Sequence, residues 1–175
     1  MPDNVATIRC MISQQASALQ ELLSSRAEDV ATAESLTGGL LADRFTDIPG
    51  SSHVFVGGVV AYASSVKTDV LGVPHQVIEH PGVVSADCAV AMAEGVRRLL
   101  GSTYGLSTTG EAGPVPAGQD PVGRVWIGVA GPEGSQAHEV DCSGAGDRRG
   151  IREAAADGAL SVLWGMLRGE EPDLG

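Results

Sequence analysis

The sequence predicts an α/β fold, a three-layer α/β/α sandwich around a mostly parallel, mixed sheet. Segments with helical apolar spacing alternate with short apolar strand segments, which is typical of layered α/β domains. Hydrophobic residues make up 43% of the chain but aromatic residues only 3%, so small aliphatic side chains must form the core. The length of 175 residues fits one domain over residues 1–175, with residues 170–175 as a frayed tail.

The N-terminal half predicts two helices and two strands before a further short helix. Apolar residues recur at helical spacing in the first segment, at Ile8, Met11, Ile12, Leu19, Leu22 and Leu23. The expected elements are a helix over 5–26, a strand over 29–33, a helix over 38–46, a buried strand over 54–63 and a helix over 66–71. Gly72 and Pro74 end the last of these.

The C-terminal half predicts a helix, three strands and a terminal helix. Ser85 is a suitable N-cap for a helix that extends to about Leu100. The following elements are expected to be a strand over 105–109, a loop over 110–123, strands over 124–130 and 135–142, and a helix over 147–167. The turn 131–134 joins the last two strands as a hairpin, which makes the sheet mixed.

Charge and composition exclude several classes of protein. With 11 basic and 22 acidic residues, the net charge is −11, which argues against nucleic-acid binding. No apolar run approaches the roughly 20 residues of a membrane span, and Met1–Asn4 does not begin a secretion signal. The three cysteines are widely spaced, so we expect reduced thiols and a cytoplasmic protein.

The first candidate site is the segment Thr32–Gly39, which predicts a strand, a tight turn and a helix start. Free backbone N–H groups at Thr37, Gly38 and Gly39 could bind an anion or a developing oxyanion beside Ser35. The alternative is that Ser35 or Thr37 simply caps the helix, and the spacing alone favours that alternative.

Lys67 is the second candidate, because it is the only lysine beside ten arginines. Burial can lower the pKa of lysine towards neutrality, whereas arginine stays protonated, so a neutral Lys67 could serve as general base for a serine. Tyr62 could orient the lysine or relay a proton. The alternatives are a surface lysine retained by chance and a tyrosine with its hydroxyl in water.

Two further segments suit ligand binding. The strand end Ser107–Pro114 offers hydroxyls and glycines, notably Thr109, Gly110 and Gly113, where α/β sheets bind ligands. Its alternative is an ordinary exit from a strand.

The segment Gly144–Arg152 places Arg148 and Arg152 at a helix start, where they oppose the helix dipole and suit a bound phosphate. The alternative is a pair of solvated surface arginines. The four histidines lack metal-ligand spacing, and no phosphate-loop or dinucleotide motif occurs, so we expect no metal and no cofactor.

Together these segments resemble the CinA C-terminal domain family over roughly residues 10–168. The matching strings are Ala33–Gly39, Asp47–Ser52, Gly58–Tyr62, Lys67 with Leu71–Val73, Gly82–Ser85, Thr109–Gly110 with Ala112–Pro114, Pro121–Gly123 with Val125–Trp126, and Gly146–Arg148 with Arg152. Several strings in this order are far more specific than any one of them.

The resemblance implies a Ser–Lys amidohydrolase that converts nicotinamide mononucleotide to nicotinic acid mononucleotide and ammonia. It assigns Ser35 as nucleophile, Lys67 as general base and Tyr62 as an active-site tyrosine. The sequence departs from the family pattern at Leu36, Glu111 and Ser64–Ser65, which leaves the substrate preference open. A non-catalytic nucleotide-binding regulatory module and a Ser–Lys hydrolase of another carboxamide are the alternatives. The expected partner is the small mononucleotide, and small-residue helices permit the homo-oligomer that we expect.

Overall fold

A single five-stranded sheet forms the centre of the computed structural model, which describes residues 4–116 and 118–172 but not the side chains of residues 4–13. The strand order is β2-β1-β3-β4-β5. The strands are β1 (Val30–Glu34), β2 (Phe55–Val60), β3 (Tyr104–Gly110), β4 (Arg124–Gly131) and β5 (Gly134–Asp141). β1 pairs in parallel with β2 and β3, whereas β4 is antiparallel to β3 and β5. Four strands thus share one direction, and the predicted mixed sheet and its hairpin are confirmed.

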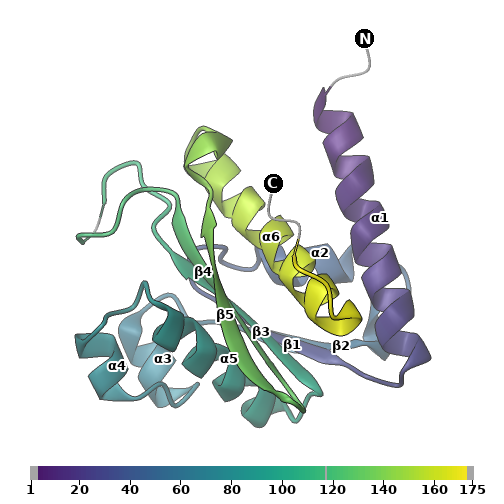
Figure 1. The fold of residues 1–175 in the computed structure, drawn as a ribbon, viewed down its shortest axis with the longest axis horizontal. Helices are drawn as coiled ribbons and strands as arrows, with labels where there is room; N and C mark the ends of the chain where they lie inside the picture. Colours follow the sequence, from purple (N-terminus) through teal and green to yellow (C-terminus); the bar gives the residue numbers. More distant parts are fainter. Residues whose placement is uncertain (1–3, 117, 173–175) are drawn as a thin grey trace.

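Helices cover both faces of the sheet, as the predicted three-layer fold requires (Figure 1). One face carries α1 (Asn4–Ser25), α2 (Leu40–Thr46) and α6 (Arg148–Arg168), and the other carries α3 (Ser64–Asp69), α4 (His75–Glu79) and α5 (Ala86–Leu100). Short 3-10 turns at Ser51–His53 and Ser143–Ala145 complete the chain. No helix of the described residues is long and apolar enough to cross a membrane.

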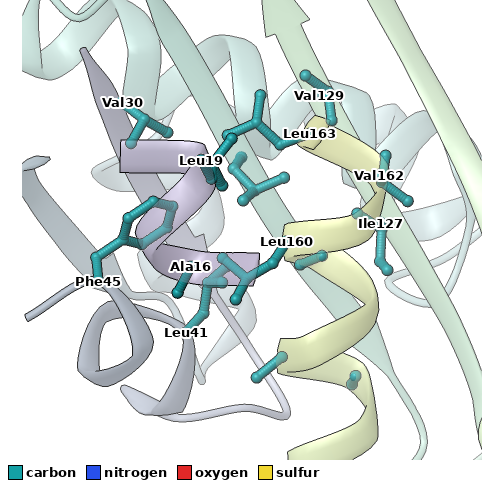
Figure 2. Packing of buried hydrophobic residues seen from close by; sticks show 14 of the residues in the cluster. Ala16, Leu19, Val30, Leu41, Phe45, Ile127, Val129, Leu160, Val162 and Leu163 are labelled. Atoms are coloured by element: carbon teal, nitrogen blue, oxygen red, sulfur yellow. The ribbon is translucent and has the colours of Figure 1, made fainter. Parts of the chain in front are cut away.

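Two apolar clusters hold the layers together. The larger one lies between the sheet and α1, α2 and α6, and it includes Leu19, Leu160 and Ile127 (Figure 2). The smaller one lies beneath α5 and consists mainly of small side chains, including Ala31, Ala33, Ala61 and Cys88. Small side chains let α5 lie close to the sheet: a Cβ at Gly128 of β4 would come within 2.3 Å of the Ala89 carbonyl oxygen.

Caps mark the helix boundaries, and the cap predicted at Ser85 is confirmed. The Ser85 side chain accepts the Cys88 N–H at the start of α5, and Asp147 accepts the Gly150 N–H at the start of α6. Gly169, at a φ of 67°, ends α6. Of the tail predicted over 170–175, residues 173–175 lie outside the described residues.

The structure describes the side chains of only some of the predicted residues. Cys88 and Cys142 are free and buried, but the side chains of Ile8, Cys10, Met11 and Ile12 lie outside the described part.

The buried strand predicted over 54–63 was wrong in its burial, because β2 is an edge strand. Val56 and Val60 are 45% and 50% exposed. A run of valine and glycine predicts a strand, but which neighbours cover it depends on strand order. The helix α4 was also not predicted, because five residues are too few for helical periodicity to be evident.

Candidate functional site

Ser35 directly follows the interior strand β1, at the carboxyl ends of the parallel strands. Its backbone N–H donates to the Thr108 carbonyl at 2.9 Å, so the ladder with β3 continues through this residue. Side chains alternate between the two faces of a strand. Ala31 and Ala33 face the α5 layer, so Ser35 continues that row towards α3 and α5.

Lys67 lies on α3 at the same edge and on the same side of the sheet. Its side chain is only 2% exposed, and its Nζ donates to the Ala61 carbonyl oxygen at 2.7 Å. Ala61 is adjacent to the Ser35 turn, since its own N–H donates to the Glu34 carbonyl oxygen at 2.7 Å. The alternative of a surface lysine is therefore excluded, and Lys67 and Ser35 converge on one edge of the sheet.

The surroundings of Lys67 favour the neutral amine. Burial lowers the pKa of Lys67, and the neighbouring thiol of Cys88 offsets this only in part. No carboxylate among the described residues pairs with the lysine. Burial also raises the pKa of Cys88, which keeps that thiol protonated. A lysine in such a place can accept a proton.

The side chain of Glu34, the last residue of β1, binds the N–H groups at the start of α2. Its carboxylate is 1% exposed and accepts the N–H groups of Gly39 at 2.8 Å, Leu41 at 3.0 Å and Ala42 at 2.9 Å. The expectation that Gly39 keeps a free N–H is therefore wrong, and so is the alternative that Ser35 or Thr37 caps the helix. Because Glu34 satisfies these donors, Thr37 and Gly38 supply the remaining candidate donors of the turn.

Threonines of β3 anchor the turn and a neighbouring loop. The hydroxyls of Thr37 and Thr108 lie 2.7 Å apart and are buried on the α2 side. Thr109, on the α5 side, donates its hydroxyl to the Val83 carbonyl at 2.5 Å. The predicted ligand-binding residue Thr109 thus holds the segment that precedes α5.

The two predicted glycines of this strand end have close backbone neighbours. Gly110 ends β3, and a Cβ there would lie 2.6 Å from the Arg124 carbonyl oxygen. Gly113 has a φ of 68° and donates its N–H to the Glu111 carboxylate at 3.0 Å. The carboxylate of Glu111 thus takes part in the turn of the β3–β4 loop.

Arg148 connects three parts of this edge. Its guanidinium donates to the Gly113 carbonyl oxygen and, at 3.1 Å, to the Tyr62 hydroxyl. Tyr62 comes after β2 and is 64% exposed, as the alternative of a tyrosine at a strand end with its hydroxyl in water predicts, but the hydroxyl also accepts from Arg148. The link brings Tyr62, Gly113 and Arg148 together across the carboxyl ends of the strands.

Beside Arg148 lies an open groove of about 650 Å³. Leu40 and Pro114 line it together with the charged residues Asp147, Arg148, Arg149, Arg152 and Glu153. Neither Arg148 nor Arg152 forms an ion pair with a described carboxylate, whereas Arg44, Arg124, Arg149 and Arg168 each do. Of the groove's carboxylates, Asp147 caps α6 and Glu153 pairs with Arg149. In a chain with a net charge of −11, the two guanidinium groups without an ion pair suit an anionic ligand.

Arg152 differs from Arg148 in its partners. Its Nε donates to the Leu36 carbonyl oxygen and a terminal nitrogen donates to the Thr37 carbonyl oxygen, both at 2.8 Å. The predicted phosphate-binding arginine is thus also attached to the turn that follows Ser35.

Sequence reasoning missed Glu34, Thr108 and Cys88 as parts of this site. A signal existed for Glu34, since an acid that ends a buried strand needs a hydrogen-bond partner. None existed for Cys88, which comes 21 positions after Lys67 in the sequence. Among the described side chains, no three His, Cys, Asp or Glu residues gather as a metal site requires.

Comparison with known proteins agrees with this fold. The family model of the CinA C-terminal domain matches residues 12–167. A CinA-like protein of Frankia casuarinae is 50% identical over 148 residues, which is 85% of this chain and 34% of the relative. A putative competence-damage inducible protein of Desulforamulus reducens is 44% identical over 86% of this chain and 36% of its own length. The chain thus spans about a third of the length of these relatives.

Solved structures show the same architecture. The competence/damage inducible protein CihA of Agrobacterium tumefaciens superposes with a TM-score of 0.84 at 34% identity, covering 90% of this chain and 95% of that one. A CinA superfamily protein of Klebsiella pneumoniae, 24% identical, has a TM-score of 0.86 over 90% of this chain and 98% of its own, which bears on the fold alone. With the family model matched over residues 12–167, this chain belongs to the CinA C-terminal domain family.

Proposed function

We propose that this chain is an amidohydrolase that splits the carboxamide of nicotinamide mononucleotide, giving nicotinic acid mononucleotide and ammonia. The observation that carries the proposal is the buried Lys67, whose pKa is lowered by burial and which lies at the same edge and face of the sheet as Ser35. A neutral amine beside a serine hydroxyl is a recognised way to activate the nucleophile.

In the first half of the reaction, Lys67 Nζ takes the proton of the Ser35 hydroxyl while Oγ attacks the carboxamide carbon. The hydrogen bond to the Ala61 carbonyl oxygen engages one N–H of the amine, so its lone pair remains available for the serine proton. The carbonyl oxygen becomes an oxyanion, which the N–H groups of Thr37 and Gly38 stabilise.

In the second half, the C–N bond breaks and ammonia leaves with the proton that Lys67 returns. The product is an ester between Ser35 Oγ and the pyridine carboxyl group. A water molecule, deprotonated by the again neutral Lys67, attacks this ester, and the ester bond to Oγ breaks. Ser35 recovers its proton, and nicotinic acid mononucleotide is released.

The phosphate of the mononucleotide is proposed to bind Arg148, with Arg152 on the same groove. Arg148 has only neutral partners among the described residues, the Tyr62 hydroxyl and the Gly113 carbonyl, so a phosphate would supply the missing opposite charge. The link from Arg148 to Tyr62 also gives that tyrosine a role at the substrate entrance rather than beside the amine.

The test is an ammonia-release assay on nicotinamide mononucleotide, nicotinamide riboside and nicotinamide. We expect ammonia from the mononucleotide, much less from the riboside, and none after Ser35→Ala. If the wild-type protein binds the mononucleotide but releases no ammonia, it is a binding module. If it releases ammonia only from other carboxamides, the chemistry stands and the substrate assignment fails.

A further inference from the structure

Arg152 holds two successive carbonyl groups of the turn after Ser35. Its guanidinium donates to Leu36 O and Thr37 O, each at 2.8 Å, and lies between α6 and the turn. A guanidinium is planar and presents its donors in a fixed fork, so two contacts of this kind restrict the orientation of both carbonyls.

The orientation of these carbonyls determines where two N–H groups point. In a planar trans peptide, the C=O and the following N–H are directed oppositely. Leu36 O shares its peptide unit with the Thr37 N–H, and Thr37 O shares its unit with the Gly38 N–H. Because both carbonyls point to Arg152, both N–H groups point away from α6.

The N–H groups of Thr37 and Gly38 therefore point towards the face of the sheet on which Ser35 lies. α6 and α2 cover one face of the sheet (Figure 1). Ala31 and Ala33 belong to the cluster on the other face, and Ser35 continues their alternation along the strand direction. The Gly39, Leu41 and Ala42 N–H groups are excluded from this role because the Glu34 carboxylate holds them. Gly38 permits the arrangement, since its φ of 59° disfavours other residues.

We propose that Arg152 is a positioning residue, which fixes the two peptide units whose N–H groups bind the oxyanion at Ser35. This role rests on the proposed amidohydrolase function. It differs from phosphate binding in its kinetic effect, because an oxyanion exists only along the reaction path. Loss of the fork therefore lowers kcat, whereas loss of a phosphate contact raises KM.

The experiment compares Arg152→Ala and Arg152→Lys with wild type, on the mononucleotide and on the riboside. Lysine keeps the charge but offers a point donor that cannot hold both carbonyls in a fixed plane. We expect kcat to fall about 100-fold in both variants on both substrates, the loss typical for an oxyanion donor. KM should stay within about threefold of wild type.

Arg168→Ala is the matched control, because it removes an arginine from the last turn of the same helix, where the side chain pairs with Glu170. It should keep wild-type kcat. Thermal unfolding of each variant separates folding from kinetics, and Arg152→Lys decides the matter if Arg152→Ala does not fold.

A kcat within about threefold of wild type in the Arg152 variants would overturn the proposed role. A KM increase confined to the mononucleotide, with kcat kept, would assign Arg152 to the phosphate instead. If wild type itself releases no ammonia, the amidohydrolase proposal fails first and this role falls with it. An active wild type with unaffected Arg152 variants refutes the role of Arg152 alone.

Discussion

Replacing Lys67 by methionine tests the proposed general base with little disturbance of its surroundings. The lysine side chain is 2% exposed and, among the described residues, makes one hydrogen bond, from Nζ to the Ala61 carbonyl oxygen at 2.7 Å. Methionine has a similar length and belongs in an apolar interior. The exchange leaves Ala61 O without this donor, a cost of about 1–3 kcal/mol, but it also removes the cost of burying an amine. We expect the free energy of unfolding to change by less than about 2 kcal/mol.

Turnover should respond far more strongly. Without a group that takes the Ser35 proton, kcat for ammonia release should fall by about 10²–10⁴-fold. The assay is initial-rate ammonia release from nicotinamide mononucleotide, with urea unfolding to verify the fold. A variant that folds normally and keeps kcat within about tenfold of wild type would refute Lys67 as the base.

Lys67→Arg is a second variant at the same position. Arginine cannot accept the proton at neutral pH, so turnover should again be lost. The guanidinium would also bring five N–H donors to a place with one described acceptor, so stability should fall as well, by about 1–3 kcal/mol. An arginine variant that is as active as wild type would return Lys67 to a purely structural role.

The lowered pKa of Lys67 gives a pH dependence of known sign. Between the folded-state pKa and the unfolded-state value of about 10.4, the unfolded chain binds more protons than the folded chain at this residue. The Lys67 contribution to stability therefore increases as pH rises through that interval and decreases as pH falls to the folded pKa. Relative to Lys67→Met, wild type should gain stability in urea unfolding as pH rises towards the unfolded-state pKa of about 10.4. An equal pH dependence of the two proteins would contradict the lowered pKa.

Three further outcomes are expected. Ser35→Ala should abolish ammonia release while the mononucleotide still stabilises the protein against heat; residual turnover would exclude Ser35 as the nucleophile. Arg148→Ala should raise KM for the mononucleotide by about 10–100-fold, because a charged hydrogen bond to the phosphate is lost, and should leave KM for the riboside nearly unchanged. Equal losses on both substrates would mean that Arg148 holds the fold through Tyr62 and Gly113. Glu34→Gln should lower the unfolding free energy by about 2–4 kcal/mol, because the amide NH₂ cannot accept N–H donors as the carboxylate does. A change below about 0.5 kcal/mol in urea unfolding would refute this account of the α2 cap.

The sequence by itself determined the layers of the fold and the identity of the candidate groups. Helical spacing and the Ser85 cap are local properties, encoded within a few residues, so α5 was predicted to within one residue at its start. The β4–β5 hairpin was also predicted from a local signal, the turn residues Gly131–Gly134. Lys67 was evident because the composition contains no other lysine.

Only the tertiary structure decided what surrounds those groups. β2 is an exposed edge strand rather than a buried one because strand order, which local pattern does not encode, leaves it with a single neighbour. Glu34 lies only a few residues from the N–H groups that it accepts, yet its burial depends on β1 lying inside the sheet, between β2 and β3. Arg152 lies 116 positions from Leu36 in the chain, and contacts at such separations follow from packing of whole elements. The lowered pKa of Lys67 has the same origin, since α3 and α5 must fold against the sheet before water leaves the amine.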